Sequence, residues 1–158
     1  MSALYVRPAM PGDTWLFLPT VRAADVAELA ALGVTPELCM REGVAQSRRS
    51  FAMFIHGQPA AIFGCVEHRT HGVPWAVVCT AAETFPIPFL RSSLRYVHSL
   101  PMFLENAVDA RNVKTIQWLR WLGFTIEAPE PMGKKGELFH RFWRAAHEEK
   151  LCATGSSR

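Results

Sequence analysis

The sequence has no long apolar run, no paired cysteines and no concentrated charge, and each absence excludes a class of protein. No stretch approaches the ~18 consecutive apolar residues of a membrane span, and no basic segment followed by an apolar one opens the chain. We therefore expect a soluble cytoplasmic protein that is not secreted through a signal peptide and has no membrane partner. Its 158 residues fit one domain with a core of its own.

Cysteine is sparse and scattered, without a C-x-x-C pair: Cys39, Cys65, Cys79 and Cys152. This spacing favours reduced, mostly buried thiols over a disulfide framework or a zinc site. Cys65 lies near His68 and His71, but without a second ligand cluster we predict ordinary hairpin residues and no metal site. Cys79 has no neighbouring base in the sequence and is interpreted as a small buried residue, not as a nucleophile.

Basic residues do not gather as they do in nucleic-acid binders. The net charge is +3, and Arg48-Arg49 and Lys134-Lys135 are only short pairs. A nucleic-acid partner is therefore not expected. Arg91, Arg95 and His98 would share one helix face, which is a solvated face in the simplest interpretation and an anion or partner surface in the alternative.

The most informative segment runs from Asp109 to Phe124, DARNVKTIQWLRWLGF. Asn112 can cap a helix with its side-chain oxygen, and Gly123 can provide a left-handed C-terminal turn. At ~100° per residue the apolar side chains share one broad face, whereas Trp121 falls in the middle of the polar face. Tryptophan is favoured at interface centres, so Trp121 is a candidate for a protein contact or self-association. The alternative is packing within the same domain.

The remaining elements are read from apolar runs, prolines and glycines. Before the segment above, we expect strands at Leu4–Ala9, Ser50–Ile55, Ala60–Glu67 and Pro74–Thr80, and helices at Trp15–Leu18, Arg22–Leu32 and from Thr35 to about Gln46. A turn through Glu83–Pro88 should lead into a helix from Pro88 to about Leu100, followed by strands at Phe103–Val108, Phe124–Ile126 and Leu138–Arg144. This order predicts a single α+β domain over residues 1–147 and a disordered tail over residues 148–158.

The order of elements, with Asn112, Thr115-Ile116 and Leu122-Gly123-Phe124, resembles the GNAT superfamily of N-acetyltransferases, whose penultimate helix carries N-x-x-(A/S)-I-x-L-Y-x-x-x-G-F. The resemblance implies an α+β fold with a mixed, mostly antiparallel central sheet and helices on both faces. It also implies acetyl-CoA in a V-shaped opening between the two central strands, beside Thr80 and Val108.

A narrower likeness is to the short GNAT-like internal virion or virion-assembly proteins of T7-like podophages. Its residues extend over nearly the whole chain to Trp143: Arg22, Asp25, Glu28 and Gly33; Gly57, Pro59, Phe63 and Gly64; Pro74-Trp75; and Asp109–Asn112 through Trp118–Phe124. This likeness implies a phage or host protein as partner, and a place in the host cytoplasm and the virion.

The superfamily holds the pyrophosphate of acetyl-CoA in an (R/Q)-x-x-G-x-(G/A) loop at a helix N-terminus. The equivalent stretch here, Thr80–Ser93, contains no glycine, and Pro86 and Pro88 lack two N–H donors of such a cradle. The remaining candidate cofactor-binding residues are Thr80, Arg91, Ser92, Ser93 and Asn112.

The second departure concerns acid–base chemistry. The tyrosine that lies seven positions after the asparagine in the superfamily, and can protonate the leaving thiolate, is Leu119 here. Glu83, Asp109 and His98 are the candidate general bases, each with a surface or capping role as the alternative. The favoured hypothesis is a GNAT-fold phage protein in virion assembly or inside the particle, with acetyl transfer degenerate or lost and no cofactor required. The alternative is an active acetyl-CoA-dependent N-acetyltransferase that modifies a host or phage amine.

Overall fold

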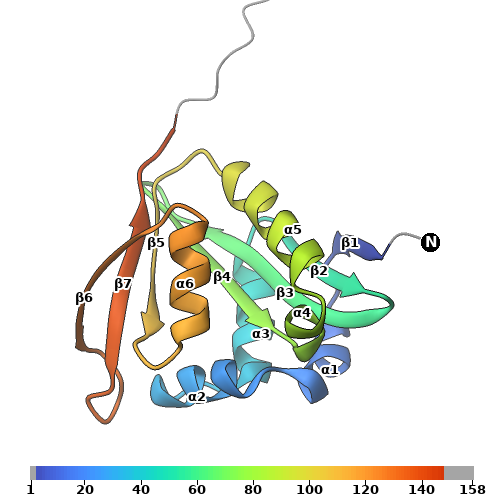
Figure 1. Cartoon of the computed structure of the whole chain (residues 1–158), viewed down its shortest axis with the longest axis horizontal. Helices are drawn as coiled ribbons and strands as arrows, with labels where there is room; N and C mark the ends of the chain where they lie inside the picture. The colour runs from blue at the N-terminus through green and yellow to red at the C-terminus, as the bar shows by residue number, and fades with distance from the viewer. Residues whose placement is uncertain (1–2, 148–158) are drawn as a thin grey trace, which may run out of the picture.

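A computed structural model describes residues 3–147 as one seven-stranded sheet with helices on both faces (Figure 1). The strands are β1 (Leu4–Pro8), β2 (Ser50–Ile55), β3 (Gln58–Glu67), β4 (Gly72–Val78), β5 (Leu104–Asp109), β6 (Thr125–Pro131) and β7 (Leu138–Arg144). The helices are α1 (Asp13–Phe17), a 3₁₀ turn η1 (Leu18–Thr20), α2 (Ala23–Ala31), α3 (Pro36–Gln46), α4 (Thr80–Thr84), α5 (Pro86–His98) and α6 (Val113–Trp121). The predicted disordered tail and Cys152 lie outside the described residues.

The sheet order is β1-β2-β3-β4-β5-β7-β6, and every neighbouring pair is antiparallel except β4 and β5. The predicted α+β fold with a mostly antiparallel central sheet is therefore confirmed. Helices α5 and α6 cover the face nearest the viewer in Figure 1, and α3 lies behind β3 and β4. Among the described residues, none of the helices has the length and apolar character to cross a bilayer.

The ends of α6 follow from the sequence. The side-chain oxygen of Asn112 accepts a hydrogen bond from the Thr115 N–H at 3.4 Å, as expected for an N-cap. Gly123 has φ +97°, a left-handed conformation that favours glycine, so the predicted C-terminal turn is confirmed. The capped helix starts directly after β5, which places its first turn beside the end of that strand.

The connection from β4 to α5 differs from the prediction. Instead of a turn through Glu83–Pro88, a short helix α4 follows β4 at once, and the Phe85 N–H donates to the carbonyl of Ala81 at 2.9 Å. Helix α5 then begins at Pro86, two residues earlier than expected, because a proline at the first helical position has no N–H to leave unpaired. A helical turn therefore occupies the place of the expected loop.

Helix α3 packs closely on β4. A Cβ at Gly43 would lie 2.6 Å from the Trp75 ring, so the helix can approach only because glycine stands there. The Trp75 indole N–H donates to Ser47 Oγ at 2.8 Å and fixes the ring against the helix. Helix α3 therefore forms a wall behind the centre of the sheet.

Candidate functional site

The two parallel central strands separate soon after they begin. Strands β4 and β5 pair only at Gly72 and Leu104, near their first residues, and diverge toward their carboxyl ends. The opening expected beside Val108 is therefore present. Open α/β sheets commonly bind ligands at the carboxyl ends of diverging parallel strands.

A cavity of about 350 Å³ fills this opening and extends to both faces of the sheet. Its walls include Ala76 of β4 and Val108 of β5, and α2, α3, α5 and α6 also contribute to them. Most lining side chains are aliphatic or aromatic; the carboxyl, amide and hydroxyl groups come from Glu28, Asn106, Thr115, Ser93 and Tyr96. Such a site suits a ligand that is apolar over most of its length, with a few fixed polar contacts.

Helix α2 and its N-cap Arg22 form hydrogen bonds with backbone groups of both strands at the wide end of the opening. The Val78 N–H donates to Asp25 Oδ2 at 2.7 Å, and the Arg22 N–H donates to the Val78 carbonyl at 2.9 Å. Three residues after Asp25 on the same helix, Glu28 Oε1 accepts from the Asp109 N–H of β5 at 2.6 Å. Two carboxylates of one helix thus hold the ends of the separated strands.

A side chain closes the narrow end. Asn106 Nδ2 donates to the Pro74 carbonyl across the gap at 2.8 Å, and Asn106 Oδ1 accepts from the Ala107 N–H at 2.8 Å. Backbone groups alternate in direction along a strand, so the N–H and C=O of Ala76, like those of Val78, point into the opening. Helix α2 engages the Val78 groups, whereas those of Ala76 have no partner among residues 3–147.

Arg22 links α2 to both sides of the site. Its guanidinium lies 2.6 Å from Asp25 Oδ1, donates to Thr115 Oγ1 of α6 at 3.2 Å, and approaches Glu83 at 3.8 Å. Arg22 and Asp25 are both buried. Burial raises the pKa of Asp25, and the neighbouring Arg22 charge opposes that rise.

Glu28 is the titratable group best placed for proton transfer in the cavity. Burial raises its pKa from 4.5 to about 7, opposed by the hydrogen bond from Asp109 and supported by the negative charges of Asp25 and Asp109. The Asn112 amide also faces Glu28 and lowers this pKa, yet Asn112 Nδ2 has no partner of good hydrogen-bond geometry in the described chain. A carboxyl with a pKa near 7 can gain and lose a proton at neutral pH.

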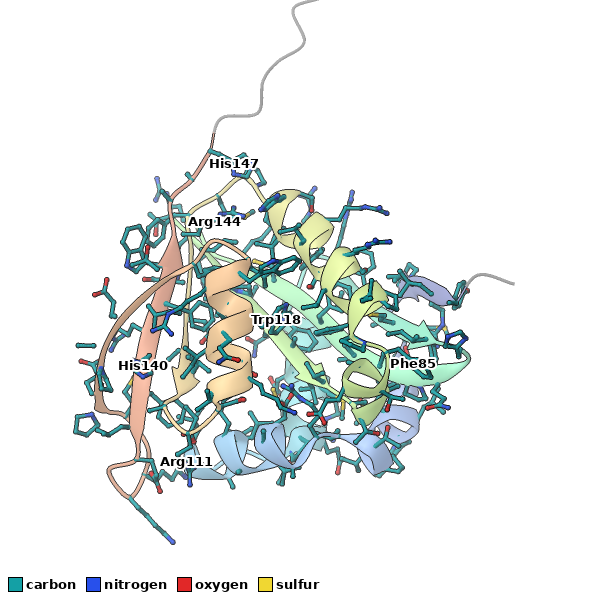
Figure 2. The ribbon with its side chains drawn as sticks, viewed as in Figure 1. Phe85, Arg111, Trp118, His140, Arg144 and His147 are labelled. Carbon is teal, nitrogen blue, oxygen red and sulfur yellow. The ribbon has the colours of Figure 1, made fainter. Side chains whose placement is uncertain are left out.

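Trp118 joins the two helices that cover the cavity. It points from α6 toward α5 (Figure 2), its ring lies 5.1 Å from that of Phe89 between centroids, and its indole N–H donates to Ser93 Oγ at 3.0 Å. Ser93 Oγ in turn donates to the Leu90 carbonyl at 2.8 Å. This bridge fixes the spacing of α5 and α6 above the opening.

Removal of the Ser93 hydroxyl should loosen that bridge. We expect Ser93→Ala to lower the free energy of unfolding by about 1–2 kcal/mol, because the Trp118 N–H loses its acceptor in a largely buried place. Urea unfolding measures the change. Ser92→Ala is the matched control on the same helix and should change stability by less than about 0.5 kcal/mol. Equal effects of the two variants would show that the bridge is not formed.

The five predicted cofactor-binding residues do not form one cluster. Ser93 is buried and engaged by Trp118, and Asn112 lies at the start of α6. Thr80 is exposed at the start of α4, Arg91 is exposed on α5, and Ser92 is partly buried. Of these residues only Ser93 lines the cavity.

The three predicted general bases also lie outside the lining of the cavity. Glu83 is exposed on α4, near Arg22, and His98 is exposed at the last turn of α5. Asp109 is buried but held by Arg111 at 2.6 Å, and this hydrogen bond keeps the pKa of the carboxyl below its usual range. Glu28 was not predicted as a base. The sequence signal that could have indicated it is its three-residue spacing from Asp25, and that of Asp25 from Arg22, which places all three on one helix face.

The three cysteines within residues 3–147 are buried or partly buried, as the sequence predicts. Cys65 and Cys79 are buried, Cys39 is partly buried, and burial raises the pKa of each thiol to about 11. Cys79 Sγ lies 3.5 Å from the Phe17 carbonyl. The rings of His68 and His71 stack on each other at 4.8 Å between centroids. These thiols are therefore protonated core groups at neutral pH.

Comparison with known proteins reveals the fold. No protein-family model matches the chain, and no curated protein sequence matches it significantly. Solved structures do match over nearly the full length. Ard1 from Thermoplasma volcanium is 16% identical, with 93% of this chain and 100% of that chain covered and a TM-score of 0.69. The chain has the GNAT acetyltransferase fold.

Two further structures carry the same fold. A GNAT superfamily phosphinothricin acetyltransferase from Sinorhizobium meliloti, solved with AcCoA, is 15% identical, covers 94% of this chain and 91% of its own, and has a TM-score of 0.68. An acetyltransferase of the GNAT family from Streptococcus pneumoniae is 16% identical over 89% of this chain and 98% of its own, with a TM-score of 0.56. At such identities the likeness concerns the fold alone.

Proposed function

We propose that this protein is an acetyl-CoA-dependent N-acetyltransferase that acts on an amine. The observation that carries the proposal is the opening between β4 and β5, which is held apart by side chains and keeps a cavity open through the sheet. A degenerate fold without a ligand would be expected to fill such a space with its own side chains, since protein interiors are close-packed.

The residues around the opening fit an acyl thioester with an amide-containing arm. The Ala76 N–H and C=O are backbone partners available to such an arm, and the apolar walls match its carbon chain. When bound, the thioester supplies the activated acyl group. Outside the opening, Arg91 and Ser92 near the start of α5 are the groups available to phosphates, although Pro86 and Pro88 offer no N–H there.

Glu28 is assigned as the general base. Its carboxylate takes the proton of the acceptor amine as the nitrogen bonds to the carbonyl carbon and the carbon–sulfur bond breaks; the sulfur finally carries a proton. Leu119 offers no proton at the place of the superfamily tyrosine, so we assign no side chain to the acid role. The hydroxyl of Tyr96 lines the same cavity, and burial raises its pKa, which keeps it neutral.

The proposal is tested by the release of free thiol from acetyl-CoA in the presence of amines. Purified protein is incubated with acetyl-CoA and a panel of small amines, polyamines and peptides, and the thiol is measured over time. We expect release that depends on both the protein and the acceptor. The proposal would be overturned if the protein gave no thiol release and no calorimetric binding signal at millimolar acetyl-CoA.

A second candidate function is a contact role in phage virion assembly or inside the particle. Three observations favour it: Leu119 replaces the proton donor, prolines stand at the start of α5, and Trp121 is 51% exposed on α6. Its partner would be a phage or host protein or a second copy of this chain. Mass spectrometry of purified particles and assembly intermediates tests this candidate, which fails if the protein is absent from both.

A substitution at Trp121 tests whether this side chain serves a protein contact or packs in the core. Because half of the side chain is exposed, Trp121→Ala should change the free energy of unfolding by less than about 1 kcal/mol while it weakens any complex or oligomer. Sedimentation and urea unfolding on the same preparation measure both effects. A loss of several kcal/mol, as for a truncated core aromatic, would show that the residue is core.

A further inference from the structure

Asn112, the N-cap of α6, carries a buried hydrogen-bond donor without a partner. The residue is only 6% exposed, and its Oδ1 accepts the Thr115 N–H, which fixes the orientation of the amide. Nδ2, on the other side of the amide, has no acceptor of good geometry among residues 3–147. Folded proteins pair nearly all of their buried polar groups, so this donor indicates an acceptor that engages it in another state of the protein.

The Glu28 carboxyl is the acceptor that the fold brings to this donor. Both side chains lie at the backbone of Asp109: Glu28 Oε1 accepts from its N–H at 2.6 Å, and the backbone N–H of Asn112 donates to its carbonyl at 3.0 Å. The amide of Asn112 lowers the pKa of Glu28, as a donor to the charged form does. Glu28 lines the cavity, whereas Asn112 does not. Asn112 therefore acts on the site through Glu28 and not through contact with a ligand.

The hydrogen-bonding capacity of Glu28 depends on its proton. An ionised carboxylate has about four acceptor positions, whereas a protonated carboxyl donates one hydrogen bond and keeps fewer acceptors. The Asp109 N–H occupies one position, so the carboxylate retains others for the Asn112 amide and for the proton of an amine. Asn112 Nδ2 thus gains its strongest acceptor when Glu28 becomes charged, because hydrogen bonds to ionised groups are stronger than those between neutral groups.

We propose that Asn112 is a positioning residue for the Glu28 base: its side-chain N–H donates to the carboxylate and, with the Asp109 N–H, holds it in the ionised form that accepts the proton of the amine. The catalytic part of this inference rests on the proposed acyltransferase function. Asn112 itself gains and loses no proton. The other titratable groups that face Glu28 are Asp25 of α2 and Asp109 of β5, whose charges oppose its ionisation, and the Cys39 thiol of α3. The two N–H donors counteract the two carboxylates.

The titration of Glu28 in the ligand-free, full-length protein tests the proposal, followed by the NMR signal of its side-chain carboxyl carbon. Asn112→Ser keeps a capping oxygen for the Thr115 N–H and removes the amide. We expect the Glu28 midpoint to move to higher pH, so that the ionised fraction at pH 6 falls roughly tenfold. Thr35→Ser exchanges one capping hydroxyl for another at the start of α3 and should keep the wild-type midpoint. A midpoint in Asn112→Ser that equals or lies below that of wild type overturns the proposal.

A second measurement needs no substitution at Asn112. In the wild-type protein, the signals of the Asn112 side-chain amide should shift with the same midpoint as the Glu28 carboxyl, and Glu28→Gln should abolish this shift. Amide signals that do not respond to pH in wild type, or that still respond in Glu28→Gln, overturn the proposal. This measurement decides even if Asn112→Ser does not fold.

The pH profile of thiol release connects the contact to catalysis. Asn112→Ser should release thiol roughly tenfold more slowly than wild type at pH 6 and approach the wild-type rate by pH 9, where Glu28 is ionised in both proteins. An equal loss at every pH would show a merely structural role and overturn the positioning. Normal release with an unmoved Glu28 midpoint overturns this inference alone. No release from any form, with the midpoint moved, overturns the proposed function and leaves the hydrogen bond between Asn112 and Glu28 in place.

Discussion

Replacement of Asp25 by alanine should lower the free energy of unfolding by about 3–5 kcal/mol, the largest single effect we expect from a charged residue in this protein. The substitution leaves the buried Arg22 guanidinium without its 2.6 Å partner and removes the acceptor of the Val78 N–H. An uncompensated buried charge is far more costly than the net contribution of the pair. Urea unfolding at neutral pH gives the difference directly.

An exposed ion pair provides the matched control. Arg41 and Glu37 lie 3.7 Å apart on α3, with side-chain exposures of 65% and 35%. Glu37→Ala should therefore change stability by at most about 1 kcal/mol. Asp25→Asn keeps an oxygen acceptor for the Val78 N–H, so its loss of stability should lie between those of Asp25→Ala and Glu37→Ala. A loss below about 1 kcal/mol for Asp25→Ala would contradict the role of α2 in holding the separated strands.

Glu28→Gln should remove most of the pH dependence of stability between pH 4.5 and 7. A carboxyl whose pKa rises from 4.5 in the unfolded chain to about 7 in the fold stabilises the protein fully below pH 4.5, and this contribution is lost as the pH rises through 7. The difference amounts to about 3 kcal/mol. Glutamine keeps an acceptor for the Asp109 N–H, so the variant should match wild type at pH 5 and exceed it at pH 8.

Wild type and variant are compared by urea unfolding at several pH values, with Glu42→Gln on the exposed face of α3 as control. The other charged groups that act on Glu28 are Asp25 on α2 and Asp109 on β5, and both are present in wild type and variant. In the thiol-release assay the same variant should lose roughly 10²–10⁴-fold in rate through the missing base. Parallel stability curves for Glu28→Gln and wild type would contradict the raised pKa.

The sequence predicts the fold well because its signals are local. Asn112 and Gly123 mark the ends of α6 through the hydrogen-bonding oxygen of one residue and the conformational freedom of the other. Apolar runs bounded by turn residues predict the strands, and this signal is also local in the sequence. The start of α5 was misplaced because Pro86 and Pro88 can both occupy a first helical turn, and the local sequence does not decide between them.

The site was less predictable, because it depends on contacts between distant segments. Glu28 contacts the Asp109 N–H 81 residues later, and Arg22 contacts Thr115 93 residues later. Residue type alone favoured Glu83 and His98, which the structure places on the surface. The burial that raises the pKa of Glu28 has no local sequence signal beyond its helical spacing from Arg22 and Asp25.

The most direct test of the central claim, that the opening between β4 and β5 holds an acyl thioester, is a titration of ¹⁵N-labelled protein with acetyl-CoA followed by amide chemical shifts. The account predicts saturable shifts at Ala76, Ala107 and Asp109, whose amides border the opening, and little change at Gly57 in the distant β2–β3 turn. Unchanged spectra at millimolar acetyl-CoA, or shifts confined to residues outside the opening, would contradict it.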